Sequence, residues 1–203
     1  MLEYRCRRSS TCFEGGHKVK ILHLIYDDIK NPWCGGGGAV RAYEINRRLA
    51  RRHDITVVTG NYPGAKTKEV KGGVTYRRIG LKRNYFLSRL SFMLLAPIVV
   101  RVMDYDLLVN DFSAYAPCFA PLYTWKPVVT SLLSLVSWHA LKKYSILGIF
   151  PLISEQVILK LSHYIVVDSE TLEKYLKEKL HLKASIQSIY NGISEYLFDI
   201  GYE

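Results

Sequence analysis

The sequence lacks the closely spaced cysteines that mark a zinc site or a disulfide framework. Its four cysteines stand at positions 6, 12, 34 and 118, and none of them forms a C-x-x-C pair. This spacing argues against a structural zinc site. A disulfide framework is typical of smaller secreted chains, so a chain of 203 residues without one favours a reducing compartment. We expect no metal ion and no cofactor.

The sequence also shows neither the features of a secretory signal nor a long unbroken apolar run. Arginines rather than an apolar segment follow the first residues. The run from Phe92 to Val100 is too short to cross a bilayer and contains Pro97. Three prolines divide the longer apolar stretch from Phe112 to Leu141. We therefore expect a cytoplasmic protein, and a peripheral contact with the inner face of an anionic membrane stays open.

Acidic residues are scarce relative to basic ones. The chain has 18 Asp and Glu against 28 Lys and Arg, which gives a net charge of +10 with histidine neutral. Such an excess favours anionic partners, namely nucleic acid, an anionic membrane surface or a phosphorylated substrate. Nucleic acid ranks last, because the 15 tyrosines do not alternate with basic residues on one pair of strands. We expect no nucleic-acid partner.

Glycine, by contrast, is concentrated in four consecutive positions, 35–38. These glycines lie between an apolar run, Val19 to Tyr26, and an amphipathic segment, Val40 to Arg52, which together predict a strand, a turn and the start of a helix. Bare backbone at a helix N-terminus presents free N–H groups to phosphate or carboxylate. A flexible turn is the alternative. The turn does not match the dinucleotide-binding fingerprint Gly-x-Gly-x-x-Gly, because the third glycine would fall at position 40 or 41. It does not match a P-loop either, because no Gly-Lys-Ser/Thr follows.

Strand-like and helix-like segments alternate along the rest of the chain. Further strands are predicted at 55–59, 74–79, 107–109, 127–130, 164–167 and 185–190, and a helix at 86–103. Residues 61–73 are expected to form a polar loop, and residues 113–123 a broken helix. The alternation predicts an α/β domain with a doubly wound, mostly parallel, Rossmann-like sheet of about seven strands and helices on both faces. Ligands of such sheets bind at the carboxyl ends of the strands, where the glycine turn lies.

Several motifs in order resemble the landmarks of one enzyme family. PWCGGGGAVRAYEINRRLA at 32–50, followed by HDITVVT at 53–59, resembles the N-terminal signature of the retaining family-four glycosyltransferases. YDLLV at 105–109, PVVT at 127–130, IVVDS at 165–169 and IYNGI at 189–193 resemble later landmarks of their N-terminal domain. The resemblance runs from about Lys18 to Phe198. It implies the GT-B fold, in which two Rossmann-like domains enclose a cleft.

The resemblance also implies an organisation and a function. Residues 1–17 would be an N-terminal extension, residues 18–198 the acceptor-side domain, and residues 199–203 the start of a linker. A C-terminal donor domain with paired glutamates would act in cis or in trans. The implied reaction is retaining transfer of a sugar from a nucleotide-sugar donor to a sugar or lipid-linked acceptor, with this chain alone inactive. The alternative is a non-enzymatic module that binds anionic lipid or glycan on the same scaffold.

Roles for single residues follow from the same resemblance. The N–H groups of Gly36, Gly37 and Gly38 would face the donor diphosphate. Asn110 and Asp111 end a central strand on the ligand side and could bind acceptor hydroxyls, although Asp111 could instead cap a following helix.

Two further positions are open to two readings each. The family often has a histidine shortly after the VVT strand, where this chain has Ser131, Leu132 and Leu133, and the next imidazole along the chain is His139. His139, as a catalytic residue with Asp111, could orient a sugar, or it could be packed in its apolar segment. Arg41 could bind a phosphorylated or lipid-linked acceptor, or it could be solvated surface.

Overall fold

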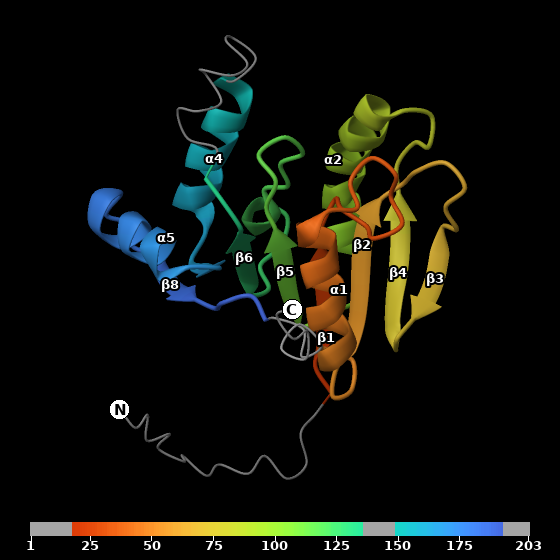
Figure 1. Ribbon diagram of the computed structural model, residues 1–203, viewed down its shortest axis with the longest axis horizontal. Coiled ribbons are helices and arrows are strands. Elements are labelled where there is room, and N and C mark those ends of the chain that lie inside the picture. The colour runs from red at the N-terminus through yellow and green to blue at the C-terminus, as the bar shows by residue number, and fades with distance from the viewer. Residues whose placement is uncertain (1–17, 136–148, 193–203) are drawn as a thin grey trace, which may run out of the picture.

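The computed structural model describes residues 18–135 and 149–192 (Figure 1). Eight strands in these residues form one sheet. In chain order they are β1 (Lys20–Leu24), β2 (Asp54–Gly60), β3 (Lys68–Lys71), β4 (Val74–Ile79), β5 (Leu107–Asp111), β6 (Val128–Leu132), β7 (Tyr164–Val167) and β8 (Ser185–Ser188). The helices are α1 (Gly37–Leu49), α2 (Tyr85–Val102), α4 (Ile149–Leu161) and α5 (Glu170–Lys174), with a short 3-10 helix η1 (Ala120–Leu122) and a π-helical turn η3 (Tyr175–Lys179).

The strand order β3-β4-β2-β1-β5-β6-β7-β8 is that of a doubly wound sheet. Every neighbouring pair is parallel except β3 with β4. The chain runs outward from β1 to β2 in one direction and returns to β5 on the other side of β1, so the strand order reverses between β1 and β5. The predicted fold class is confirmed, and the reversal point is where such sheets bind ligands.

Two segments differ from their predicted structure. The polar loop predicted at 61–73 contains the edge strand β3, which a two-glycine turn pairs with β4; Gly72 and Gly73 have φ angles of 58° and 79°, as a type I′ hairpin requires. The broken helix predicted at 113–123 is limited to η1. The three buried alanines Ala114, Ala116 and Ala120 lie in this segment, which is therefore mostly irregular but packed.

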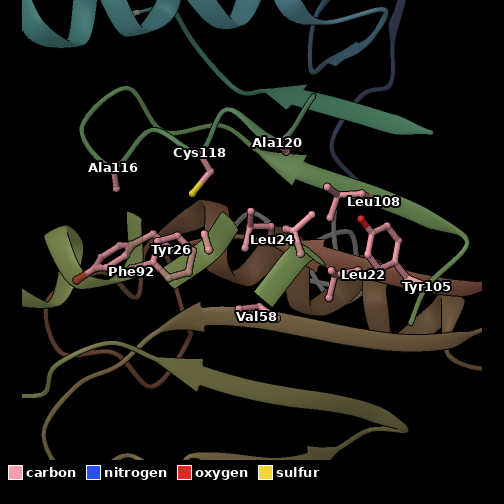
Figure 2. Packing of buried hydrophobic residues seen from close by; sticks show 12 residues of the cluster. Leu22, Leu24, Tyr26, Val58, Phe92, Tyr105, Leu108, Ala116, Cys118 and Ala120 are labelled. Carbon is pink, nitrogen blue, oxygen red and sulfur yellow. The ribbon is translucent and has the colours of Figure 1, made fainter. Parts of the chain in front are cut away.

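Alternate residues of the central strands face two separate cores. On one face, Leu22, Leu24 and Val58 pack against α2 through Phe92, Ala96 and Val100, as Figure 2 shows for the labelled residues. On the other face, Ile21, Ile25 and Val57 pack with Ala42 of α1. The helices α1 and α2 therefore cover opposite faces, which Figure 1 also shows. This parity decides which side chains of β1 and β5 reach the region around α1.

Candidate functional site at the carboxyl edge of the sheet

The loop between β1 and α1 is held in place by hydrogen bonds to two buried polar side chains. Asn31 is buried, and its side chain accepts a hydrogen bond from the backbone N–H of Trp33 at 2.9 Å. Buried Asp28 accepts hydrogen bonds from the backbone N–H of Lys30 at 2.9 Å and from Arg78 Nε at 2.8 Å. These contacts fix the long connection and deliver the glycine turn to the carboxyl edge of β1.

The N-terminus of α1 is free of side-chain caps. Its N-cap residue is Gly36, which has no side chain to accept a hydrogen bond from the first turn, and the first turn contains no acidic residue. The first helical hydrogen bond runs from Val40 N–H to Gly36 O at 3.2 Å, so the N–H groups of the three residues before Val40 have no partner within the helix. The positive end of the helix dipole is thus open to an anion.

The glycines of this turn differ in what a side chain would meet. A Cβ at Gly35 would lie 3.1 Å from two backbone carbonyl oxygens, those of Ile29 and Asn31, so packing explains the glycine there. A Cβ at Gly36 or Gly37 would meet nothing within 4 Å. A Cβ at Gly38 would make ordinary contacts with Leu133 and with Asp27 Oδ2. The fold itself therefore does not require glycine at the two exposed positions.

A chain of buried hydrogen bonds links α1 to β5 beside this turn. Asn46 Nδ2 lies 2.7 Å from His23 Nδ1, and His23 Nε2 lies 3.0 Å from Asp111 Oδ2. With Asn46 Nδ2 as the donor, Nδ1 is the acceptor and the imidazole proton is on Nε2. His23 Nε2–H then donates to Asp111 Oδ2. The imidazole therefore orients a carboxylate at the carboxyl edge.

Arg41 reaches across the same edge from the second turn of α1. Its Nη1 donates to Ser131 Oγ at 3.2 Å and lies 3.7 Å from Asp111 Oδ1, and its Nε donates to Asn191 Oδ1 at 2.9 Å. Asp111 Oδ1 is buried and has no hydrogen-bond partner among the described residues. A buried carboxylate oxygen without a donor is an unused acceptor.

Two carboxyl groups at this edge have pKa values displaced in opposite directions. Burial alone would raise the pKa of Asp111, but His23, the Ser131 hydroxyl and Arg41 outweigh it and hold this pKa below its usual range. Burial raises the pKa of Asp27, and the negative charge of Asp111 raises it further, against the lowering effects of Arg89 and Cys34. Opposed environments of this kind are common where one carboxyl group must stay ionised and another must bind a proton.

A comparison with family models matches residues 35–195 to Glycosyltransferase Family 4. The chain belongs to this family. The match spans most of the sequence and includes the glycine turn, β5 and β6. A comparison with curated proteins gives no significant match.

Solved structures show that this Family 4 chain has the fold of one GT-B domain. It is similar to sucrose-phosphate synthase from Thermosynechococcus elongatus, with 14% identity, a TM-score of 0.65 and coverage of 89% of this chain and 50% of the other. It is also similar to a glycosyltransferase from Rickettsia africae, with 15% identity, a TM-score of 0.52 and coverage of 91% of this chain and 46% of the other. The chain thus spans about half the length of these proteins.

The structure brings some of the predicted residues of the Family 4 domain together and separates others. Asp111 and Arg41 lie next to each other, with Arg41 Nη1 3.7 Å from Asp111 Oδ1. Asn110 points to the opposite face of β5, where it is fully buried and its Nδ2 donates to the Cys118 carbonyl oxygen at 2.9 Å. This placement gives no support to acceptor binding by Asn110, which stays a prediction. His139 lies outside the described residues.

The alternatives left open for Asp111 and Arg41 can be compared with these contacts. Asp111 does not cap a helix, since the residues that follow it are irregular as far as η1. The Arg41 side chain is only 14% exposed and is engaged on two sides, so it is not a solvated surface residue.

Three residues of the site were missed by sequence reasoning: His23, Asn46 and Asp27. His23 lies within an apolar strand, where a histidine is usually a packed core residue, and Asn46 lies on the inner side of a helix. The signal that could have found His23 is the alternation of side chains along a strand, because residues 21, 23 and 25 share the face that α1 covers. The pairing of His23 with Asp111, however, depends on β1 lying next to β5, which only the topology provides.

Proposed function

We propose that this domain is the acceptor-side half of a retaining glycosyltransferase that transfers a sugar from a nucleotide-sugar to a sugar or lipid-linked acceptor. The observation that carries the proposal is the uncapped N-terminus of α1, with Gly36 and Gly37 open, beside the oriented carboxylate of Asp111. Membership of Glycosyltransferase Family 4 supports the transferase class.

The glycine turn would act on the leaving group. Transfer of the sugar leaves negative charge on the diphosphate, and fixed N–H dipoles aimed at developing charge lower the barrier without reorganising. The N–H groups of Gly37 and Gly38 are such dipoles, and Gly36, which has no side chain, leaves the diphosphate room to approach them. A side chain at the two exposed positions would hold the phosphates away from the backbone.

The acceptor would be bound by Asp111, Arg41 and Asp27. The unused Oδ1 of Asp111 is an acceptor for a sugar hydroxyl, and the hydrogen bond from His23 keeps the carboxylate in one orientation. Arg41 adds a positive charge next to it for a phosphorylated or lipid-linked acceptor. Asp27 lies near Gly38 in the first turn of α1 and senses the charge of Asp111, so it would meet both substrates.

A donor domain would complete the site, in cis or in trans, because nucleotide contacts in this family come mainly from the second domain. The chain alone would therefore be inactive. We place the assembled enzyme in the cytoplasm. Neither a cofactor nor a metal ion enters the proposed reaction.

The test is sugar transfer by an assembled two-lobe protein, in which this chain is joined to a Family 4 donor domain. The assay supplies radiolabelled nucleotide-sugars with sugar and lipid-linked acceptors, and the anomeric configuration of any product is read by NMR. We expect transfer with retention by the assembled protein and none by the chain alone. An inverted product would overturn retention. Acceptor binding without any transfer would instead support the non-enzymatic binding module.

A further inference from the structure

Helix α2 is apolar on its outer side as well as on its core side. Its core side is the row Ser88, Phe92, Ala96 and Val100, each at most 2% exposed. Its outer side exposes a second row with a spacing of four residues: Phe86 at 71%, Leu90 at 41%, Leu94 at 66%, Ile98 at 55% and Val102 at 74%. A surface helix normally turns polar residues outward. The outer row, hereafter the α2 stripe, runs along a helix about 27 Å long.

Basic residues stand at both ends of the α2 stripe. Lys82 and Arg83 precede the helix, Arg101 lies in its last turn, and the helix itself contains no Asp or Glu. The carboxylate that follows the helix, Asp104, is paired with Lys20 at 2.5 Å. The α2 stripe is therefore an apolar surface with positive ends, on a chain whose net charge is +10.

Among the described residues, α2 is also the one helix long and apolar enough to cross a bilayer. A spanning orientation would remove Phe92, Ala96 and Val100 from the core that they form with β1 and β2. The buried row therefore keeps α2 on the sheet and leaves the stripe facing outward.

We propose that the α2 stripe docks this domain on an anionic bilayer surface, with α2 lying in the interface rather than across it. An apolar face with basic flanks fits this partner, because its apolar side chains enter the acyl boundary and its cations meet anionic headgroups. A second lobe that completes the site would cover the carboxyl edge of the sheet, whereas the stripe runs down the face of the sheet away from that edge.

The position of α2 relative to the glycine turn gives the docking a consequence. The Tyr85 ring in its first turn lies 6.4 Å from the Trp33 ring, and Arg89 Nη2 donates to Cys34 Sγ at 3.3 Å. Docking through the stripe would therefore hold the mouth of the site close to the headgroups. The docking goes beyond sugar transfer, and its test needs no turnover.

Flotation of the 203-residue chain with lipid vesicles tests the proposal. We expect binding to vesicles that contain phosphatidylglycerol and weaker binding to phosphatidylcholine alone. Phe86→Ser with Leu94→Ser should lower the partition coefficient about tenfold or more, because both side chains leave the acyl boundary. Val70→Ser is the matched control, since Val70 is 66% exposed on β3, outside the stripe. Circular dichroism checks that each variant is folded.

A second pair of substitutions tests the basic residues at the two ends of the α2 stripe. Arg83→Gln with Arg101→Gln should weaken binding to the anionic vesicles and reduce its sensitivity to salt. Ile98→Trp adds a fluorophore within the stripe to the three native tryptophans, and brominated lipid should quench the additional emission of this variant relative to the wild type. Absence of quenching, or equal partition of wild type and the serine variant, would overturn the proposal. If the wild type does not bind vesicles but forms a dimer that the serine substitutions dissociate, the proposal is overturned. The stripe would then be covered by a second copy of this chain.

Discussion

Two aspartates at the carboxyl edge show how single residues set the chemistry of this site. Asp111 is buried among donors that hold its pKa down, whereas Asp27 is half-buried, and its burial together with the negative charge of Asp111 holds its pKa up. Asp111 ends β5 and Asp27 follows the neighbouring strand β1, and the negative charge of Asp111 contributes to the raised pKa of Asp27. Their pH dependences must therefore have opposite signs, which makes each of them testable by itself.

Replacing Asp111 with asparagine should destabilise the fold in a pH-dependent way. The pKa of Asp111 is lower in the folded chain than in the unfolded chain, so its ionised form contributes stability above the unfolded value of about 3.9. This contribution is lost as the pH falls through the folded pKa. We expect Asp111→Asn to lower the free energy of unfolding by about 1–3 kcal/mol at neutral pH, with the difference vanishing in acid.

Urea unfolding of both proteins across the acid range measures this difference. Asp104→Asn is the control, because Asp104 makes a solvent-exposed ion pair with Lys20 and should contribute much less. An Asp111→Asn variant as stable as the wild type at neutral pH would show that the link from His23 to Asp111 does not hold the fold.

Asp27 should make donor affinity depend on pH. A diphosphate at the start of α1 would lie near its carboxylate, and the raised pKa of Asp27 lets a proton relieve that repulsion. In the two-lobe enzyme we expect the Kd for a nucleotide-sugar to rise with pH through the pKa of Asp27. Asp27→Asn should remove this dependence. Titration calorimetry at several pH values measures the Kd of the wild type and of the variant. Equal pH profiles for the two proteins would contradict the prediction.

Among single residues, the sequence could predict which ones end strands but not which ones meet. Asp111 and Arg41 lie at the predicted edge. Asn110 and Asp111 are neighbours in a strand, so they point to opposite faces, and this parity was available from the sequence. The pairing of His23 with Asp111 was not, because it requires the order of strands in the sheet.

At the scale of secondary-structure elements, the start of α1 combines a structural glycine with glycines that the fold does not need. Gly37→Ala should leave stability unchanged or slightly higher, since the methyl group meets open space and alanine favours a helix. Turnover of the two-lobe enzyme should fall about tenfold, because the methyl group separates the backbone from the diphosphate. Thermal unfolding and initial rates measure the two effects.

Gly35→Ala is the matched variant with the opposite outcome. Its methyl group would press on two carbonyl oxygens at 3.1 Å, so we expect a loss of stability of about 1–3 kcal/mol. Full turnover of Gly37→Ala would mean that the diphosphate does not approach this backbone.

Elements with strong periodicity were predictable, and those set by tertiary context were not. Short apolar runs predicted β1, β2 and the later parallel strands, because buried strands of a parallel sheet are nearly all apolar, and apolar-polar alternation predicted β4. The edge strand β3 has the sequence KEVK and no apolar face, so its only signal was the pair of glycines that follows it. The segment before η1 packs through small alanines, and alanines at these positions are equally compatible with a helix.

At the scale of the whole molecule, Arg41 connects the site to the last described part of the chain. Its Nε donates to Asn191, which follows β8, and its Nη1 donates to Ser131 of β6. In the proposed two-lobe enzyme, the path to the donor lobe begins just beyond Asn191. One side chain would thus link acceptor binding to the position of the connection between lobes.

Asn191→Ala and Ser131→Ala separate the two parts of this link. Both should raise the KM for the acceptor in the two-lobe enzyme, because each removes one hydrogen bond that orients Arg41. Only Asn191→Ala should speed hydrogen exchange of the amides around β8, since only it frees the segment after that strand. We expect each to change the free energy of unfolding by less than about 1.5 kcal/mol. Unchanged exchange around β8 in Asn191→Ala would show that Arg41 acts within the sheet alone and does not restrain the path between the lobes.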